Sequence, residues 1–91
     1  MPVTVHIPAP LREHTNKQER VSTEGNTVAA VLEDLSRQFP TLTERLFEKP
    51  GQLRRFVNVY LNDEDIRYLD SLETSVAAGD QISIIPAVAG G

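Results

Sequence analysis

The sequence contains no cysteine among its 91 residues. Disulfides, thiolate nucleophiles and sulfur-ligated metal sites are therefore excluded. The two histidines, His6 and His14, lie in different segments, and neither begins a motif with the spacing of metal ligands. The chain also lacks a P-loop and the glycine pattern of a dinucleotide site. We expect neither a bound metal nor a bound cofactor.

Positive charge is scarce as well, with 9 Lys and Arg against 13 Asp and Glu, for a net charge of -4. Nucleic acids are bound largely through Lys and Arg at phosphates, so a nucleic-acid partner is not expected. No apolar run approaches the roughly 20 residues of a membrane span, and no membrane partner is expected either. The first residues lack the basic and apolar regions of a secretory signal, which predicts a cytoplasmic location.

Alternating apolar residues predict three main strands. They cover residues 3–7, 56–61 and 81–86, where β-branched residues recur with period two. Two weaker segments, 19–22 and 66–69, are predicted to be short strands, the latter at a sheet edge.

One long amphipathic helix is predicted between the strands at residues 19–22 and 56–61. Its apolar positions follow helical spacing, and they are Val28, Val31, Leu32, Leu35 and Phe39. Asn26 or Thr27 can cap its start, and Pro40 ends it. A single amphipathic helix must cover one sheet face, which predicts a two-layer α+β domain over residues 1–86. With the first and last strands at the centre, this is a β-grasp arrangement: a mixed sheet of four to five strands packed on one main helix.

The final residues follow the last strand directly and carry no charge or bulky side chain. We expect residues 87–91 to form a flexible tail that inserts into a partner through Ala87, Val88, Ala89 and Gly90. Glycine lacks Cβ, so Gly90 and Gly91 can pass through a narrow slot. Chemistry would then occur at the Gly91 carboxylate, although the dipeptide alone would also suit an inert glycine end.

Strand phase predicts a docking surface beside this tail. If one face of these strands meets the helix, then Phe56, Tyr60, His6 and Ile85 share the opposite sheet face. The residues expected to meet the helix are Val3, Val5, Val57, Val59, Ile82 and Ile84. Exposed apolar patches often mark partner sites, so Phe56, Tyr60 and Ile85 are candidate docking residues. Scattered apolar residues on a sheet face are the alternative.

The C-terminal segment 79–91, GDQISIIPAVAGG, ends a predicted β-grasp domain in Gly-Gly. In this it resembles the ubiquitin-like sulfur carriers, the family of MoaD, ThiS and CysO. The resemblance covers essentially the whole chain. The segment 55–67, RFVNVYLNDEDIR, is most similar to the cysteine-synthesis branch, that of CysO.

The resemblance implies a carrier and co-substrate of partner enzymes, not an enzyme. An adenylating enzyme of the ubiquitin-activating type, with sulfurtransferase function, would use ATP to activate the Gly91 carboxylate. A sulfur donor would then leave a thiocarboxylate on Gly91. In the cysteine branch, a pyridoxal-phosphate cysteine synthase would receive this sulfur, and a metalloprotease would release the cysteine.

Two alternatives stay open within the resemblance. A molybdopterin synthase small subunit would insert the same tail into the large subunit, for molybdenum cofactor biosynthesis. A ubiquitin-like protein modifier would join Gly91 to lysines of target proteins. Because the chain has no cysteine, a carrier of this kind could hold sulfur only at its terminal acyl group.

Overall fold

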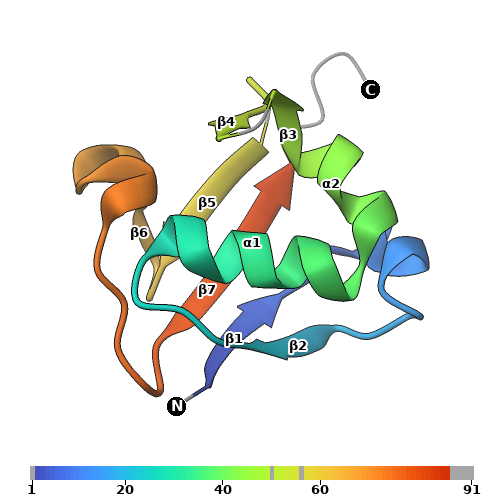
Figure 1. Cartoon of the computed structure of the whole chain (residues 1–91), viewed down its shortest axis with the longest axis horizontal. Coiled ribbons are helices and arrows are strands. Elements are labelled where there is room, and N and C mark those ends of the chain that lie inside the picture. Colours follow the sequence, from blue (N-terminus) through green and yellow to red (C-terminus); the bar gives the residue numbers. More distant parts are fainter. Residues whose placement is uncertain (1, 50, 56, 87–91) are drawn as a thin grey trace.

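A five-stranded mixed sheet forms one layer of the structure (Figure 1). The computed structural model describes residues 2–49, 51–55 and 57–86. The strand order is β2-β1-β7-β5-β6, in which β1 and β7 are parallel and the other neighbours antiparallel. The strands are β1 (Val3–His6), β2 (Arg20–Thr23), β5 (Val57–Leu61), β6 (Glu64–Asp65) and β7 (Gln81–Pro86). The predicted central pairing of the first and last strands is confirmed.

Within the described residues, two α-helices and three 3-10 helices accompany this sheet. They are η1 (Ala9–His14), α1 (Val28–Gln38), α2 (Pro40–Leu46), η2 (Ile66–Tyr68) and η3 (Ser71–Glu73). The Thr27 hydroxyl caps α1 by accepting a hydrogen bond of 3.1 Å from the Ala30 amide. Helix α1 ends at Gln38 and Pro40 occupies the first turn of α2, so α1 ends before Pro40, as predicted.

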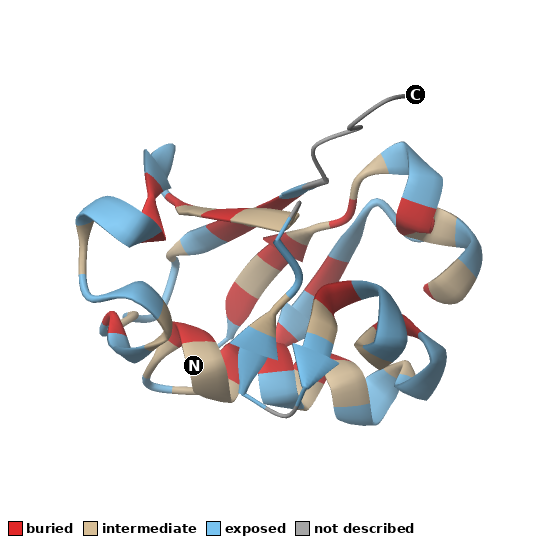
Figure 2. Cartoon of the chain, turned by 90° about the horizontal axis from the view of Figure 1, so that it is seen from above, coloured by how far each residue is buried: buried red, intermediate tan, exposed pale blue. Residues whose placement is uncertain are grey.

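The core lies between α1 and one face of the sheet. On α1 the buried stripe is Val28, Val31, Leu32 and Leu35, each fully buried, as the helical spacing predicts. The strands contribute Val3, Val5, Val59, Ile82 and Ile84 to the same cluster. Figure 2 shows buried and less buried segments alternating along the strands, which is the pattern of a sheet covered on one face.

The predicted edge strand at residues 66–69 is wrong, because η2 occupies most of that segment. The chain reverses at Asn62 and Asp63, which both have positive φ, 49° and 74°, so β6 begins at Glu64, two residues before the predicted strand. Two such residues form the tight hairpin turn that places β6 immediately afterwards. The Asp65 side chain then caps η2 by accepting from the Arg67 amide, and Ile66 turns into the core.

A second, two-stranded sheet was not expected from the sequence. It is the hairpin of β3 (Phe47–Lys49) and β4 (Gln52–Leu53), with Gly51 at φ 78°. Arg54 ties this hairpin to α2, since its amide donates to the Leu46 carbonyl at 2.8 Å and its Nε donates to the Glu44 carbonyl at 2.6 Å.

Candidate functional site

The central strand β7 leads directly to the C-terminal tail. It pairs with β1 on one side and with β5 on the other, where Val57 opposes Pro86. Residues 82 and 83 are therefore paired on both sides, whereas residues 84–86 are paired with β5 alone. The predicted tail, Ala87, Val88, Ala89, Gly90 and Gly91, lies outside the described residues. The domain boundary at residue 86 therefore stays a prediction, as does the role of Gly91.

A tight turn fixes the beginning of β7. Gly79 adopts φ 89°, a conformation that favours glycine. The Asp80 carboxylate accepts hydrogen bonds from the Ala77 amide at 2.8 Å and from the Asn62 side chain at 3.1 Å. These two bonds, the first being the stronger cause, lower the pKa of Asp80. The turn and the β5–β6 hairpin are consequently joined at this end of the sheet.

The outer face of the sheet, opposite α1, carries the predicted docking residues that the structure describes. His6, Ser83 and Tyr60 oppose one another across β1, β7 and β5, so they form one row. Asn58 opposes Ile85 in the next row toward the tail. The structure thus brings Tyr60, His6 and Ile85 onto one face, while Phe56 lies outside the described residues.

Exposure differs among these residues. Ile85 is 46% exposed, the highest value for a large apolar residue of the described part of the sheet. Tyr60 and His6 are half-buried, and His6 Nε2 lies 2.8 Å from Gln81 Oε1. An isoleucine with this exposure, two residues before the tail, gives the outer face an apolar contact at the point where the tail begins.

An ion pair lies at the β6 edge of this face, and it was not predicted from the sequence. Arg67 donates to the Asp65 carboxylate through Nε at 3.2 Å and through its terminal nitrogen at 2.7 Å. The side-chain bonds of Arg67 lower the pKa of Asp65, whose side chain is 6% exposed. Asp65 opposes Tyr60 across the sheet, so the pair extends the row at the β6 edge. Only the short spacing of Asp65 and Arg67 could have indicated it.

Three arginines line one cavity of this acidic chain. The cavity has a volume of about 240 Å³, and its lining includes Arg54, Arg55 and Arg67, together with Asp65, which forms an ion pair with Arg67. Arg54 and Arg55 lie between β4 and β5 in the chain. Their position beside β5 places them close to the β5–β7 pairing that precedes the tail.

Within residues 2–49, 51–55 and 57–86, no group of three or more His, Asp or Glu could hold a metal ion. Asp63 and Glu64 lie at the hairpin turn and are exposed. No helix in the described part of the chain has the length and apolarity to cross a membrane.

Comparison with known proteins decides the family. The profile of the ThiS family matches residues 5–91, nearly the whole chain. The chain belongs to the ThiS family. This ThiS family member is 50% identical over 93 aligned residues to the "Sulfur carrier protein CysO" of Mycobacterium tuberculosis, with 100% of both chains covered.

Solved structures agree with this assignment. A chain in the crystal structure of the Amycolatopsis orientalis BexX/CysO complex matches with a TM-score of 0.90 and 45% identity, covering 98% of this chain and 99% of that one. The small archaeal modifier protein 1 of Methanosarcina acetivorans matches with a TM-score of 0.89 and 33% identity, over 99% and 96% of the two chains. The ThiS family member therefore has the ubiquitin-like β-grasp fold and is a sulfur carrier of the ThiS and MoaD type, as the sequence predicted.

Proposed function

We propose that this carrier holds sulfur as a thiocarboxylate on Gly91. A carboxylate is a poor electrophile, because it is negatively charged and lacks a good leaving group. In the first step, a Gly91 carboxylate oxygen attacks the α-phosphate of ATP on an activating enzyme and releases pyrophosphate. In the second step, a sulfur nucleophile attacks the acyl carbon. The C–S bond forms, the C–O bond to AMP breaks, and AMP leaves. The enzyme must supply the electrostatic stabilisation of both steps.

The carrier presents its C-terminal end to the activating enzyme, and it performs no catalysis of its own. Ordering five tail residues in a slot costs on the order of 5–10 kcal/mol of backbone entropy. Small side chains cannot offset that cost, so docking of the folded body must supply much of the difference. We assign the docking to the outer face around Ile85 and Tyr60, together with Phe56. The observation that supports this assignment is the exposure of Ile85 at the end of the central strand.

We further propose that the sulfur serves cysteine synthesis in the cytoplasm. The support is the 50% identity to CysO over the full length of both chains. The thiocarboxylate sulfur would attack an aminoacrylate held by a pyridoxal-phosphate cysteine synthase. An acyl shift from sulfur to nitrogen would follow, and a metalloprotease would cleave the resulting amide, returning Gly91 to a carboxylate. The large subunit of molybdopterin synthase is the alternative acceptor.

A protein-modifier function is the second candidate. It is favoured by the 33% identity to the small archaeal modifier protein 1. Both functions share the adenylation step and differ in the acceptor, which is a sulfur nucleophile for the carrier and a lysine amine for the modifier.

The absence of cysteine makes the test selective. The full chain is incubated with ATP, its activating enzyme and a sulfide source, and then treated with iodoacetamide. Since the chain has no cysteine, alkylation under mild conditions reports a terminal thiocarboxylate. We expect one alkyl group per chain, and none when ATP is omitted or when one residue is added after Gly91. Ladders on other proteins without alkylation would instead support the modifier function.

A further inference from the structure

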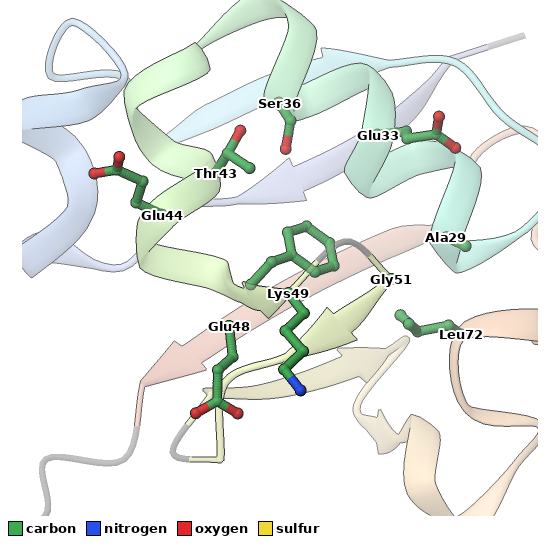
Figure 3. Close-up of a pocket in the computed structure, with 10 residues that line it drawn as sticks. Ala29, Glu33, Ser36, Thr43, Glu44, Glu48, Lys49, Gly51 and Leu72 are labelled. Carbon is green, nitrogen blue, oxygen red and sulfur yellow. The ribbon is translucent and has the colours of Figure 1, made fainter.

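A groove opens on the helix side of the molecule, away from the outer face. It has a volume of about 470 Å³ and lies between α1, α2, the β3–β4 hairpin and η3 (Figure 3). Its apolar wall includes Ala29, Phe47 and Leu72. Figure 3 shows the Ser36 hydroxyl and the Leu72 side chain directed into this space.

The groove follows from a second stripe on α1. Ala29, Glu33 and Ser36 are spaced i, i+4 and i+7, beside the buried stripe that faces the sheet. The small side chain of Ala29 leaves room that a larger residue would fill. Phe47 and Leu72 are partly buried against the core and turn their remaining surface toward the groove.

Acidic side chains surround this apolar wall. Glu33, Glu44 and Glu48 all line the groove and are exposed. Among the residues that the structure describes, none of the three forms an ion pair, since the recorded carboxylate partners are those of Glu13, Glu19, Asp34 and Asp65. Lys49 is the single cation among the described lining residues. The rim is therefore a site of net negative charge, complementary to a basic ligand.

The groove wall also contains a polar atom in need of a partner. Ser36 Oγ is buried and has no hydrogen-bond partner within the described part of the chain. Buried hydroxyls are normally paired, so this one is available to a polar group of a bound molecule.

We propose that this groove binds a basic amphipathic helix of a partner protein. A large apolar side chain of that helix enters between Ala29, Phe47 and Leu72. Lysine or arginine side chains one turn to either side meet Glu33 and Glu48, as in other helix-in-groove complexes. The outer face stays free, so the carrier can be held on its helix side while Gly91 reacts in another active site. This inference does not depend on the chemistry proposed for Gly91.

Titration of the ¹⁵N-labelled full chain tests the proposal. The probe is a synthetic amphipathic peptide of leucine and lysine, and its control is the same peptide with every lysine replaced by glutamate. We expect saturable amide shifts at Ala29, Ser36 and Thr43 with the lysine peptide and none with the glutamate peptide. Shifts confined to the outer face, equal binding of both peptides, or no shifts at all would each overturn the proposal.

Matched charge reversals separate the groove from the general acidity of the chain. The double variant Glu33→Lys with Glu48→Lys should bind the lysine peptide about tenfold more weakly. The affinity that remains should depend less on salt concentration. Glu13→Lys with Glu64→Lys changes the net charge equally at exposed residues that do not line the groove, and it should preserve the affinity within about twofold. An equal loss in both double variants would overturn the proposal. Iodoacetamide labelling of Gly91 should be the same in all of them, so the two proposals fail independently.

Discussion

Replacing Ile85 by aspartate tests whether the outer face docks the activating enzyme. Ile85 is 46% exposed in the free chain, and its neighbour across the sheet is Asn58. The substitution therefore removes little core packing, and the fold should persist. In the complex, by contrast, the new carboxylate would face an apolar surface of the partner beside the tail.

The expected loss follows from two contributions. Fully burying an isoleucine stabilises by about 1.5–3 kcal/mol, so covering the exposed half of Ile85 is worth about 1 kcal/mol. Leaving a polar group unsatisfied at the interface costs about 1–3 kcal/mol more. The total of about 2–4 kcal/mol corresponds to a decrease in kcat/KM of roughly thirtyfold to a thousandfold.

The assay is release of pyrophosphate by the activating enzyme at low carrier concentration. Ser22→Asp is the matched control, because Ser22 is exposed on β2, opposite Thr4, and two strands away from β7. We expect a change of less than about threefold for this control. An unchanged kcat/KM for Ile85→Asp, or an equal decrease for Ser22→Asp, would refute the assignment of the docking surface.

Three further predictions concern stability. Thr27→Ala removes the bond that Thr27 accepts from the Ala30 amide and should lower the free energy of unfolding by about 1 kcal/mol in urea titrations. Gly25→Ala places a Cβ 2.8 Å from the Val31 amide nitrogen, so we expect a loss of about 1–3 kcal/mol by the same measurement, and a neutral result would contradict this packing. The bonds from Arg67 lower the pKa of Asp65, so their stabilisation is present above about pH 4 and is lost as the pH falls through the folded-state pKa. Asp65→Asn should therefore lower stability at neutral pH and flatten its decline in acid, as followed by circular dichroism.

Much of the fold was predictable because the relevant signals are local. The spacing of Val28, Val31, Leu32 and Leu35 fixes which side of α1 is buried, and the alternation in β7 fixes which isoleucines face it. The central position of β7 followed from its apolar content.

The errors arose where backbone conformation outweighed side-chain pattern. Residues 66–69 contain apolar residues typical of a strand, but the positive φ angles of Asn62 and Asp63 complete the reversal earlier and leave η2 in that segment. The hairpin of β3 and β4 was missed because each strand is only two or three residues long.

The candidate site was predictable only in part. Strand phase placed Tyr60, His6 and Ile85 on one face, since alternation is a property of each strand alone. The helix-side groove depends on contacts between separate elements, which no local pattern encodes. The Asp65–Arg67 pair is local, but only the short spacing of the two residues could have indicated it.

Tandem mass spectrometry of the product tests the central claim, that sulfur is held on the acyl carbon of Gly91, most directly. Exchange of oxygen for sulfur adds about 16 Da, which is close to the mass added when methionine is oxidised to its sulfoxide. The chain has a single methionine, Met1, at the opposite end, so fragmentation distinguishes the two products. The account predicts that the added mass appears only in C-terminal fragments that contain Gly91, and only when ATP is present. Added mass on N-terminal fragments alone, or normal sulfur incorporation by a chain that lacks Gly90 and Gly91, would contradict it.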